Sequence, residues 1–272
     1  MADLFRPLSD CGPRCLTPRG FGLAGRLRTW MRAAAAVVIL VLTACAATLV
    51  TVTPQRVRAT AARRLLRGAA RTLLRALGVR LETTGLAVPD QRALIAGNHV
   101  SWLDILAVLA ATDARLVAKT EVGSWPVIGR LARLCGTIFI DRQNPRSLPA
   151  TIAEVRDALA AGDVVVAFPE GTTTCGAHTM AYRPALFQAA IDARARVVPM
   201  TLRFRRPDGR PYPNSAFIGD ETLLESLNRV AETPSQRLEL HIGTSLHPDA
   251  GASRKQLARL AAGVPARHVL AA

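Results

Sequence analysis

Aromatic residues are scarce throughout this chain, and acidic residues are scarce near its N-terminus. Only 4% of the 272 residues are Phe, Trp or Tyr. Residues 1–80 contain 14 arginines, two acids and few aromatic residues, among them Phe21 and Trp30. Surfaces that bind single-stranded nucleic acid combine cations with aromatic rings on which bases stack. The composition therefore argues against nucleic acid as a partner, and a basic membrane-associated nucleic-acid-binding protein is kept only as the alternative from a different functional class.

Cysteines are few, odd in number and scattered along the sequence. Cys11 and Cys15 are not followed by a second pair of residues with the spacing of zinc ligands. We interpret all the cysteines as reduced thiols without a role: Cys11, Cys15, Cys45, Cys135 and Cys175. We predict no metal and no bound cofactor.

A long apolar run lies within the basic N-terminal part. Residues 33–52 read AAAAVVILVLTACAATLVTV and carry no charge. As a helix, a run of about 20 residues crosses the hydrocarbon core of a bilayer. A cleaved signal peptide would have a shorter run nearer the start of the chain, so we favour a retained membrane helix. A membrane-embedded hairpin formed with the next segment stays open. Arginines flank both sides of the run, so they do not set its orientation.

The segments on either side of this run differ in character. Residues 1–32 are rich in Arg, Pro and Gly, and we expect them to be poorly ordered. Residues 56–80 contain eight arginines and no acid, with small and apolar residues at helical spacing. We predict a basic amphipathic helix that lies on an anionic membrane surface. An ordinary surface helix packed on the following domain is the alternative.

From residue 81 to residue 247 the pattern predicts one α/β domain with a largely parallel sheet covered by helices. Short apolar runs predict buried strands at residues 93–96, 116–118, 137–140, 164–168, 197–202 and 238–242. Helical patterns lie between several of them, at residues 102–111, 126–135, 148–161 and 184–193. Residues 248–272 form a C-terminal tail with a short helix predicted at 253–262.

A histidine and an aspartate follow the first buried strand. Residues 98–104 read NHVSWLD, and they lead from that strand into a predicted helix. Ligands of α/β sheets bind beyond the carboxyl ends of the strands, which is where His99 lies. Asp104 stands one helical turn further on and can turn back to the imidazole. The carboxylate then fixes the tautomer, and the other ring nitrogen can take a proton from a hydroxyl.

Other segments with chemical potential also border predicted strands. Residues 168–172 read FPEGT, and the glycine allows backbone amides to approach an anion closely. Residues 136–142 read GTIFIDR, which places Arg142 at a strand end where its guanidinium can fork onto a phosphate. Pro199 lies within an apolar run and predicts a sheet edge, a bulge or a strand end near a pocket. Ser101 has no Gly-x-Ser-x-Gly context, which argues against a covalent serine route.

Taken in chain order, NHVSWLD, GTIFIDR, FPEGT and the apolar run with Pro199 resemble the four motifs of the glycerolipid acyltransferase family, which includes the lysophosphatidic acid acyltransferases. The resemblance implies that His99 is the general base and that Asp104 orients it. It implies that the acceptor is bound by these residues: Arg142, Glu170, Gly171, Thr172 and Lys119. It further implies that Pro199 shapes the acyl pocket.

The resemblance implies a lysophospholipid O-acyltransferase, most specifically a 1-acyl-sn-glycerol-3-phosphate acyltransferase. One departure concerns the acceptor: many members that bind a phosphate have Arg where this chain has Thr173. A lyso-ornithine lipid O-acyltransferase is therefore the alternative. The donor implied is acyl-CoA or acyl carrier protein, and because both are cytoplasmic we expect the catalytic domain to face the cytoplasm from the cell membrane. The intact His99 and Asp104 argue against a catalytically silent scaffold.

Overall fold

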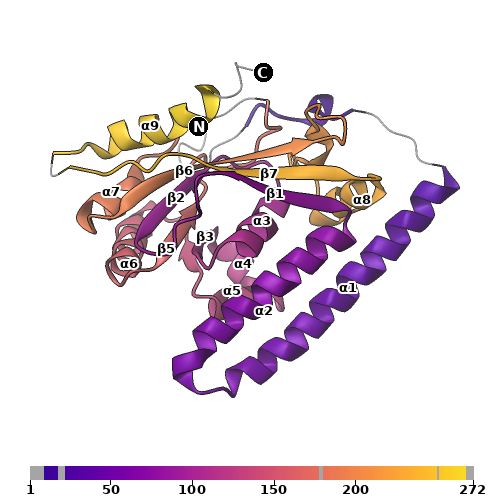
Figure 1. The fold of residues 1–272 in the computed structure, drawn as a ribbon, viewed down its shortest axis with the longest axis horizontal. Coiled ribbons are helices and arrows are strands. Elements are labelled where there is room, and N and C mark those ends of the chain that lie inside the picture. The colour runs from indigo at the N-terminus through magenta and orange to yellow at the C-terminus, as the bar shows by residue number, and fades with distance from the viewer. Residues whose placement is uncertain (1–8, 18–21, 178–179, 250, 268–272) are drawn as a thin grey trace.

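A seven-stranded sheet forms the centre of the molecule (Figure 1). The computed structural model describes residues 9–17, 22–177, 180–249 and 251–267. The strands lie in the order β1-β7-β6-β2-β5-β3-β4. Their bounds are β1 Val79–Gly85, β2 Ala93–Gly97, β3 Arg115–Lys119, β4 Ile138–Ile140, β5 Val164–Ala167, β6 Arg196–Arg205 and β7 Gln236–Ile242.

All neighbouring strands are parallel except β6 and β7. The prediction of a largely parallel sheet is confirmed, and each predicted strand coincides with an observed one. The carboxyl ends of β2, β5, β3 and β4 consequently meet at one edge of the sheet. Strand β1 was not predicted, because its sequence VRLETTG alternates weakly and most of it is partly or fully exposed.

Helices cover both faces of the sheet (Figure 1). The bounds of the helices in the catalytic domain are α3 Leu103–Ala111, α4 Thr120–Ser124, α5 Ile128–Leu134, α6 Leu148–Ala160, α7 Ala185–Asp192, α8 Leu223–Glu232 and α9 Arg254–Arg267. Alternate residues of β2 enter two separate hydrophobic clusters. Ile95 packs in the cluster that contains Leu103 of α3, whereas Leu94 packs in the cluster that contains Leu159 of α6 and Phe187 of α7.

The apolar run belongs to a longer helix than predicted, α1 Leu23–Thr51. The expectation that residues 1–32 are poorly ordered was wrong for residues 23–32, which are helical, and for a 3₁₀ turn at Pro13–Cys15. Residues 1–8 and 18–21 lie outside the described part of the chain. Two arginines explain the early start of α1: Arg28 and Arg32 donate hydrogen bonds to carbonyl oxygens at the end of α8. Orphan carbonyls at a helix end attract such cations.

The basic helix α2 Gln55–Ala76 packs on the domain with its apolar side. Ala62, Leu66, Leu73 and Leu74 are buried, as is Leu77, which follows the helix. Burial of each leucine contributes about 1.5–3 kcal/mol to folding. That apolar side is therefore not free to lie in a membrane surface, because α1 and α3 already cover it. A contact of the arginine side of α2 with an anionic membrane stays a prediction. The alternative, a helix packed on the domain, is what the structure has.

Helix α1 differs from α2 because much of its apolar surface stays uncovered. It is long and apolar enough to cross a membrane, and only 17% of its most apolar window is buried. Val37, Val38, Val41, Leu42 and Leu49 are more than half exposed. The two helices form an antiparallel hairpin beside the sheet (Figure 1), so α1 is the outer helix of that hairpin.

Candidate active site

The turn between β2 and α3 brings the predicted histidine and aspartate together. Nδ1 of His99 lies 2.8 Å from Oδ2 of Asp104. The same carboxylate oxygen accepts hydrogen bonds from the backbone amides of Val100 at 2.6 Å and Ser101 at 2.8 Å. Asp104 stands in the first turn of α3, where a helix favours a negative charge. The aspartate thus fixes both the imidazole and the turn that carries it.

The environment of His99 sets which nitrogen is available for chemistry. The carboxylate accepts, so Nδ1 carries the proton and Nε2 has a free lone pair. The ring stacks on Phe168 with centroids 4.3 Å apart and an angle of 18° between the ring planes. The His99 side chain is 20% exposed, whereas the Asp104 side chain is fully buried. The imidazole is therefore held rigidly from behind and accessible in front, as a general base requires.

Glu170 lies behind His99 and is 1% exposed. One of its carboxylate oxygens accepts a hydrogen bond from the backbone amide of His99 at 2.8 Å, and the other accepts one from Met180 at 3.0 Å. Burial raises the pKa of the Glu170 carboxyl to about 7, against a smaller lowering by these two amides. Both oxygens bind the protein's own backbone, so these contacts make Glu170 a support for the His99 turn and give no evidence that it touches an acceptor.

Arg142 reaches the same region from the opposite side of the sheet edge. It follows β4, and its Nη1 donates a hydrogen bond to the carbonyl oxygen of Gly171. Gly171 has φ 77°, a conformation that suits glycine, and its amide closes a turn onto the Phe168 carbonyl. Burial lowers the pKa of the Arg142 guanidinium, nearby Glu121 opposes this, and the positive charge of Arg183 lowers it further. The fold therefore brings Arg142, Gly171, Glu170 and His99 into one neighbourhood.

The remaining predicted residues lie at the margin of this neighbourhood. Lys119 is exposed at the end of β3, and Thr172 is half-buried directly after Gly171. Pro199 is buried within β6, opposite Ala96 of β2. The expectation of a sheet edge at Pro199 was wrong, because β6 lies between β7 and β2. Pro199 instead precedes the first residue of β6 that pairs with β7, where a missing amide is tolerated.

Sequence reasoning missed several residues that shape the site. The buried side chain of Asn98 bridges to β6, since its oxygen accepts from the Leu202 amide at 2.8 Å and its nitrogen donates to the Leu202 carbonyl at 3.0 Å. Thr173, already singled out in the sequence as a departure from the family motif, donates a hydrogen bond to the Phe217 carbonyl, a contact that the motif did not predict. Arg183 is exposed, and its positive charge contributes to lowering the pKa of Arg142. A polar residue directly before His99 was the available signal for Asn98, whereas Arg183 is 41 positions from Arg142 in the sequence and gave none.

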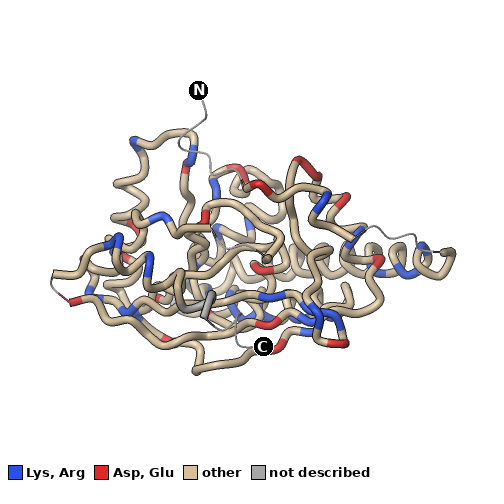
Figure 2. Tube along the Cα trace, turned by 90° about the horizontal axis from the view of Figure 1, so that it is seen from above, with Lys and Arg blue, Asp and Glu red and all other residues tan. Residues whose placement is uncertain are grey.

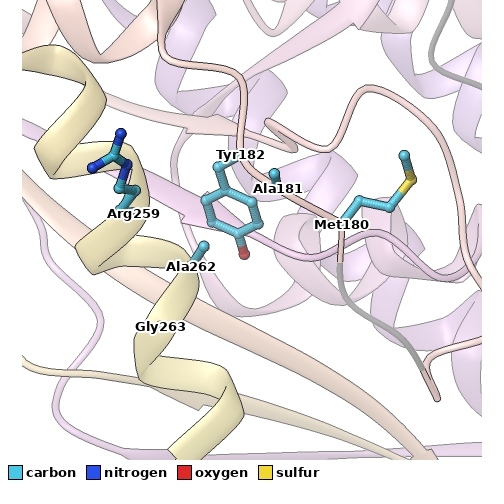
Figure 3. Close-up of a pocket in the computed structure, with 6 residues that line it drawn as sticks. All are labelled: Met180, Ala181, Tyr182, Arg259, Ala262 and Gly263. Carbon is cyan, nitrogen blue, oxygen red and sulfur yellow. The ribbon is translucent and has the colours of Figure 1, made fainter.

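A cavity of about 320 Å³ lies next to this region, between α9 and the segment that follows the FPEGT turn (Figure 3). It is lined by Met180, Ala181, Tyr182, Arg259, Ala262 and Gly263. Glu170 connects the two places, because it binds the amide of Met180 on one side and that of His99 on the other. His99 itself does not line the cavity, so the catalytic candidate sits on the opposite side of Glu170.

Comparisons with known proteins agree with this architecture. The family model described as Acyltransferase matches residues 79–203. The chain is 33% identical over 196 residues to the lyso-ornithine lipid O-acyltransferase of Rhizobium meliloti strain 1021, covering 68% of this chain and 67% of that protein. It is 39% identical over 158 residues to the 1-acyl-sn-glycerol-3-phosphate acyltransferase of Neisseria meningitidis serogroup B, covering 57% of this chain and 62% of that protein.

Among solved structures, the 1-acyl-sn-glycerophosphate acyltransferase PlsC from Thermotoga maritima matches with a TM-score of 0.68 and 18% identity, over 91% of this chain and 95% of that one. At this identity the likeness shows a shared fold. Fold and site together define an enzyme that transfers acyl groups. The chain belongs to the acyltransferase family, as the predicted resemblance implied.

Proposed function

We propose that this enzyme is a membrane-bound lysophospholipid O-acyltransferase that acylates 1-acyl-sn-glycerol 3-phosphate, with His99 as the general base. The observation that carries the catalytic part is the 2.8 Å contact between Nδ1 of His99 and the buried carboxylate of Asp104. It leaves the lone pair of Nε2 available on a partly exposed side chain that follows the carboxyl end of β2, where α/β proteins bind their ligands.

The reaction is a direct transfer from a thioester. Nε2 of His99 takes the proton of the acceptor hydroxyl while the oxygen attacks the thioester carbonyl. The new ester C–O bond forms, the C–S bond breaks, and the proton returns from the imidazolium to the departing thiolate. Asp104 stabilises the imidazolium through Nδ1. The thiolate is a good leaving group, so neither a metal nor a covalent enzyme intermediate is required for the bond exchange.

Two cations support an anionic acceptor. Arg142 uses one N–H group to bind Gly171, and a guanidinium has five in all. Arg183 is near enough to influence the pKa of Arg142. Together they compensate for Thr173, whose hydroxyl is engaged by the Phe217 carbonyl. A lyso-ornithine lipid is the second candidate acceptor, and the similarity to a lyso-ornithine lipid O-acyltransferase over 68% of the chain favours it.

The exposed apolar side of α1 supports membrane attachment. Arginines lie at the start of α1, and acids and bases are mixed over the catalytic domain (Figure 2). Arginines near an anionic leaflet add about 1 kcal/mol each to surface binding. The donors we propose, acyl-CoA or acyl carrier protein, are cytoplasmic, so the catalytic domain faces the cytoplasm.

Purified full-length protein, one labelled acyl-CoA or acyl carrier protein donor, and a panel of lysolipid acceptors test this proposal. We expect 1-acyl-sn-glycerol 3-phosphate to give the highest kcat/KM and His99→Ala to lower kcat by about 10²–10⁴-fold. Preference for a lyso-ornithine lipid would replace the acceptor assignment but keep the mechanism. Near wild-type turnover by a folded His99→Ala variant would overturn the mechanism.

A further inference from the structure

Three cysteines that are far apart in the sequence converge beside the candidate active site. The sulfur atoms of Cys11, Cys15 and Cys175 all lie within 4.8 Å of one another. Cys11 precedes the 3₁₀ turn Pro13–Cys15 near the N-terminus and Cys15 is its last residue, whereas Cys175 follows the FPEGT turn. The sequence led us to interpret these cysteines as reduced thiols without a role, and spacing along the chain did not predict that they converge, because Cys175 is 160 positions away from Cys15.

We propose that Cys11, Cys15 and Cys175 bind a zinc ion through their three thiolates. In a tetrahedral site with Zn–S bonds of about 2.3 Å, the sulfurs lie about 3.8 Å apart. The three sulfurs lie within 4.8 Å of one another, so each pair needs to approach by at most about 1 Å to reach the spacing of a zinc site. Three residues separate Cys11 from Cys15, which is within the two to four residues typical of paired zinc ligands.

The surroundings of the sulfurs fit thiolate ligands. The backbone amide of Cys175 donates a hydrogen bond to Sγ of Cys11 at 3.2 Å. Such amide donors orient metal ligands and stabilise their negative charge. Three thiolates select soft cations of the zinc class over magnesium or calcium, which prefer oxygen. Within the described part of the chain the group has three members, which supply three of the four ligands of a tetrahedral zinc ion.

The ion would join the N-terminal segment to the loop after the FPEGT turn, which in turn contacts the backbone of His99. Next to Cys175, the amide of Thr174 donates to the carbonyl oxygen of His99 at 2.9 Å. At the other end of the segment, Thr17 and the buried Asn214 exchange hydrogen bonds through the backbone and the amide side chain. Residues 11–17 are thus fixed at Asn214 and, through the metal, at Cys175. The zinc has a structural role and takes no part in acyl transfer, so this inference stands apart from the proposed function.

Cobalt substitution in the full-length protein tests the site. Purified apo-protein in detergent is titrated with Co²⁺, and thiolate-to-cobalt charge transfer is recorded in the near ultraviolet. We expect the wild type to give this band together with the visible bands of tetrahedral cobalt, and we expect added Zn²⁺ to displace both. Elemental analysis of protein purified without chelator should find zinc bound to the wild type.

The matched variants are Cys11→Ser, Cys15→Ser and Cys175→Ser against Cys45→Ser and Cys135→Ser, whose thiols lie outside the group. The first three should each weaken cobalt binding by at least 10-fold, and the other two should bind like the wild type. Circular dichroism shows which variants are folded. Because Cys15 is not buried, Cys15→Ser keeps the test valid if Cys175→Ser misfolds.

A wild type without a cobalt band overturns the proposal, as does a band that survives in Cys15→Ser. The competing possibility is a disulfide bond between two of the three cysteines, and thiol titration of the unfolded, unreduced protein tests for it. Two missing thiols, restored by a reductant, would identify a disulfide within the group and would also overturn the metal site.

Discussion

Replacing Asp104 by asparagine separates the charge of this side chain from its role in shaping the turn. Oδ2 of Asp104 accepts three hydrogen bonds, from Nδ1 of His99 and from the amides of Val100 and Ser101. The oxygen of an asparagine can accept the same three bonds. Asp104→Asn should therefore keep the turn and the tautomer of His99 and lose the negative charge beside the ring. Its amide NH2 group takes the place of Oδ1, which is buried without a hydrogen-bond partner, so the variant also carries one buried unpaired donor.

The size of the effect follows from what the imidazolium loses. A hydrogen bond to a charged partner contributes about 1.5–3 kcal/mol, and a neutral one about 0.5–1.5 kcal/mol. The bond itself therefore accounts for about 1 kcal/mol. Opposite charges about 4 Å apart attract by about 4 kcal/mol at an effective dielectric constant of about 20, which is an upper bound here. At about 1.4 kcal/mol per tenfold change in rate, we expect kcat to fall by about fivefold to 10³-fold.

Steady-state kinetics and thermal unfolding measure the two consequences separately. Asp104→Asn should lower kcat strongly and Tm less than Asp104→Ala does, because it leaves one buried group unpaired where the alanine variant leaves two. Asp104→Ala should lower both, because it leaves the amides of Val100 and Ser101 without their acceptor, at about 1–3 kcal/mol each. Asp113→Asn is the control, since Asp113 forms an exposed ion pair with Arg67. A kcat within twofold of the wild type for Asp104→Asn would refute the role of the charge. A Tm as low as that of Asp104→Ala would show that asparagine does not keep the hydrogen bonds that hold the turn.

Three further predictions follow from the same contacts. Glu170 keeps its proton up to about pH 7 in the folded protein but only to about 4.5 when unfolded, so its contribution to the free energy of unfolding falls as pH rises between these values; denaturant unfolding at several pH values should show this decline in the wild type and lose it in Glu170→Gln. Arg142→Ala should raise the KM for 1-acyl-sn-glycerol 3-phosphate by about tenfold to 10²-fold and affect the donor KM little; an equal, negligible effect on both an anionic and a zwitterionic lysolipid would remove Arg142 from the site. Val41→Lys with Leu42→Lys, at exposed positions of α1, should shift the protein from the membrane to the soluble fraction while leaving Tm unchanged, because a lysine in the middle of a membrane helix costs about 2.5–3.5 kcal/mol; unchanged sedimentation with membranes would show that another surface binds the lipid.

The local patterns of the chain were informative wherever neighbours in sequence are also neighbours in space. The buried strands were predicted because each is a short apolar run, and β2 and β5 are buried along their whole length. The contact between His99 and Asp104 was predicted because both lie on one turn between a strand and a helix. Helix α8 was missed although Thr222 and Glu225 form a capping box at its start, a signal that was present in the sequence.

The sequence pattern of a segment does not show which other part of the protein, or which lipid, covers that segment. The apolar stripe of α2 predicts an interface equally well with lipid and with protein. Only the packing of Leu73, Leu74 and Leu77 into the main core decides for protein. Likewise, the FPEGT motif places Glu170 at a strand end, but its carboxylate turns inward to two backbone amides.

The sequence by itself determined the α/β class, the contact between His99 and Asp104 and the acyltransferase family, because periodicity and short motifs are local properties. Tertiary structure alone decided which segments meet. It joined Arg142 to Gly171, set Arg183 near enough to Arg142 to lower its pKa, and brought Cys11 and Cys15 to Cys175. The physical reason is that long-range contacts depend on how helices and strands pack after each has formed, and burial of apolar surface, which drives that packing, has no direction of its own.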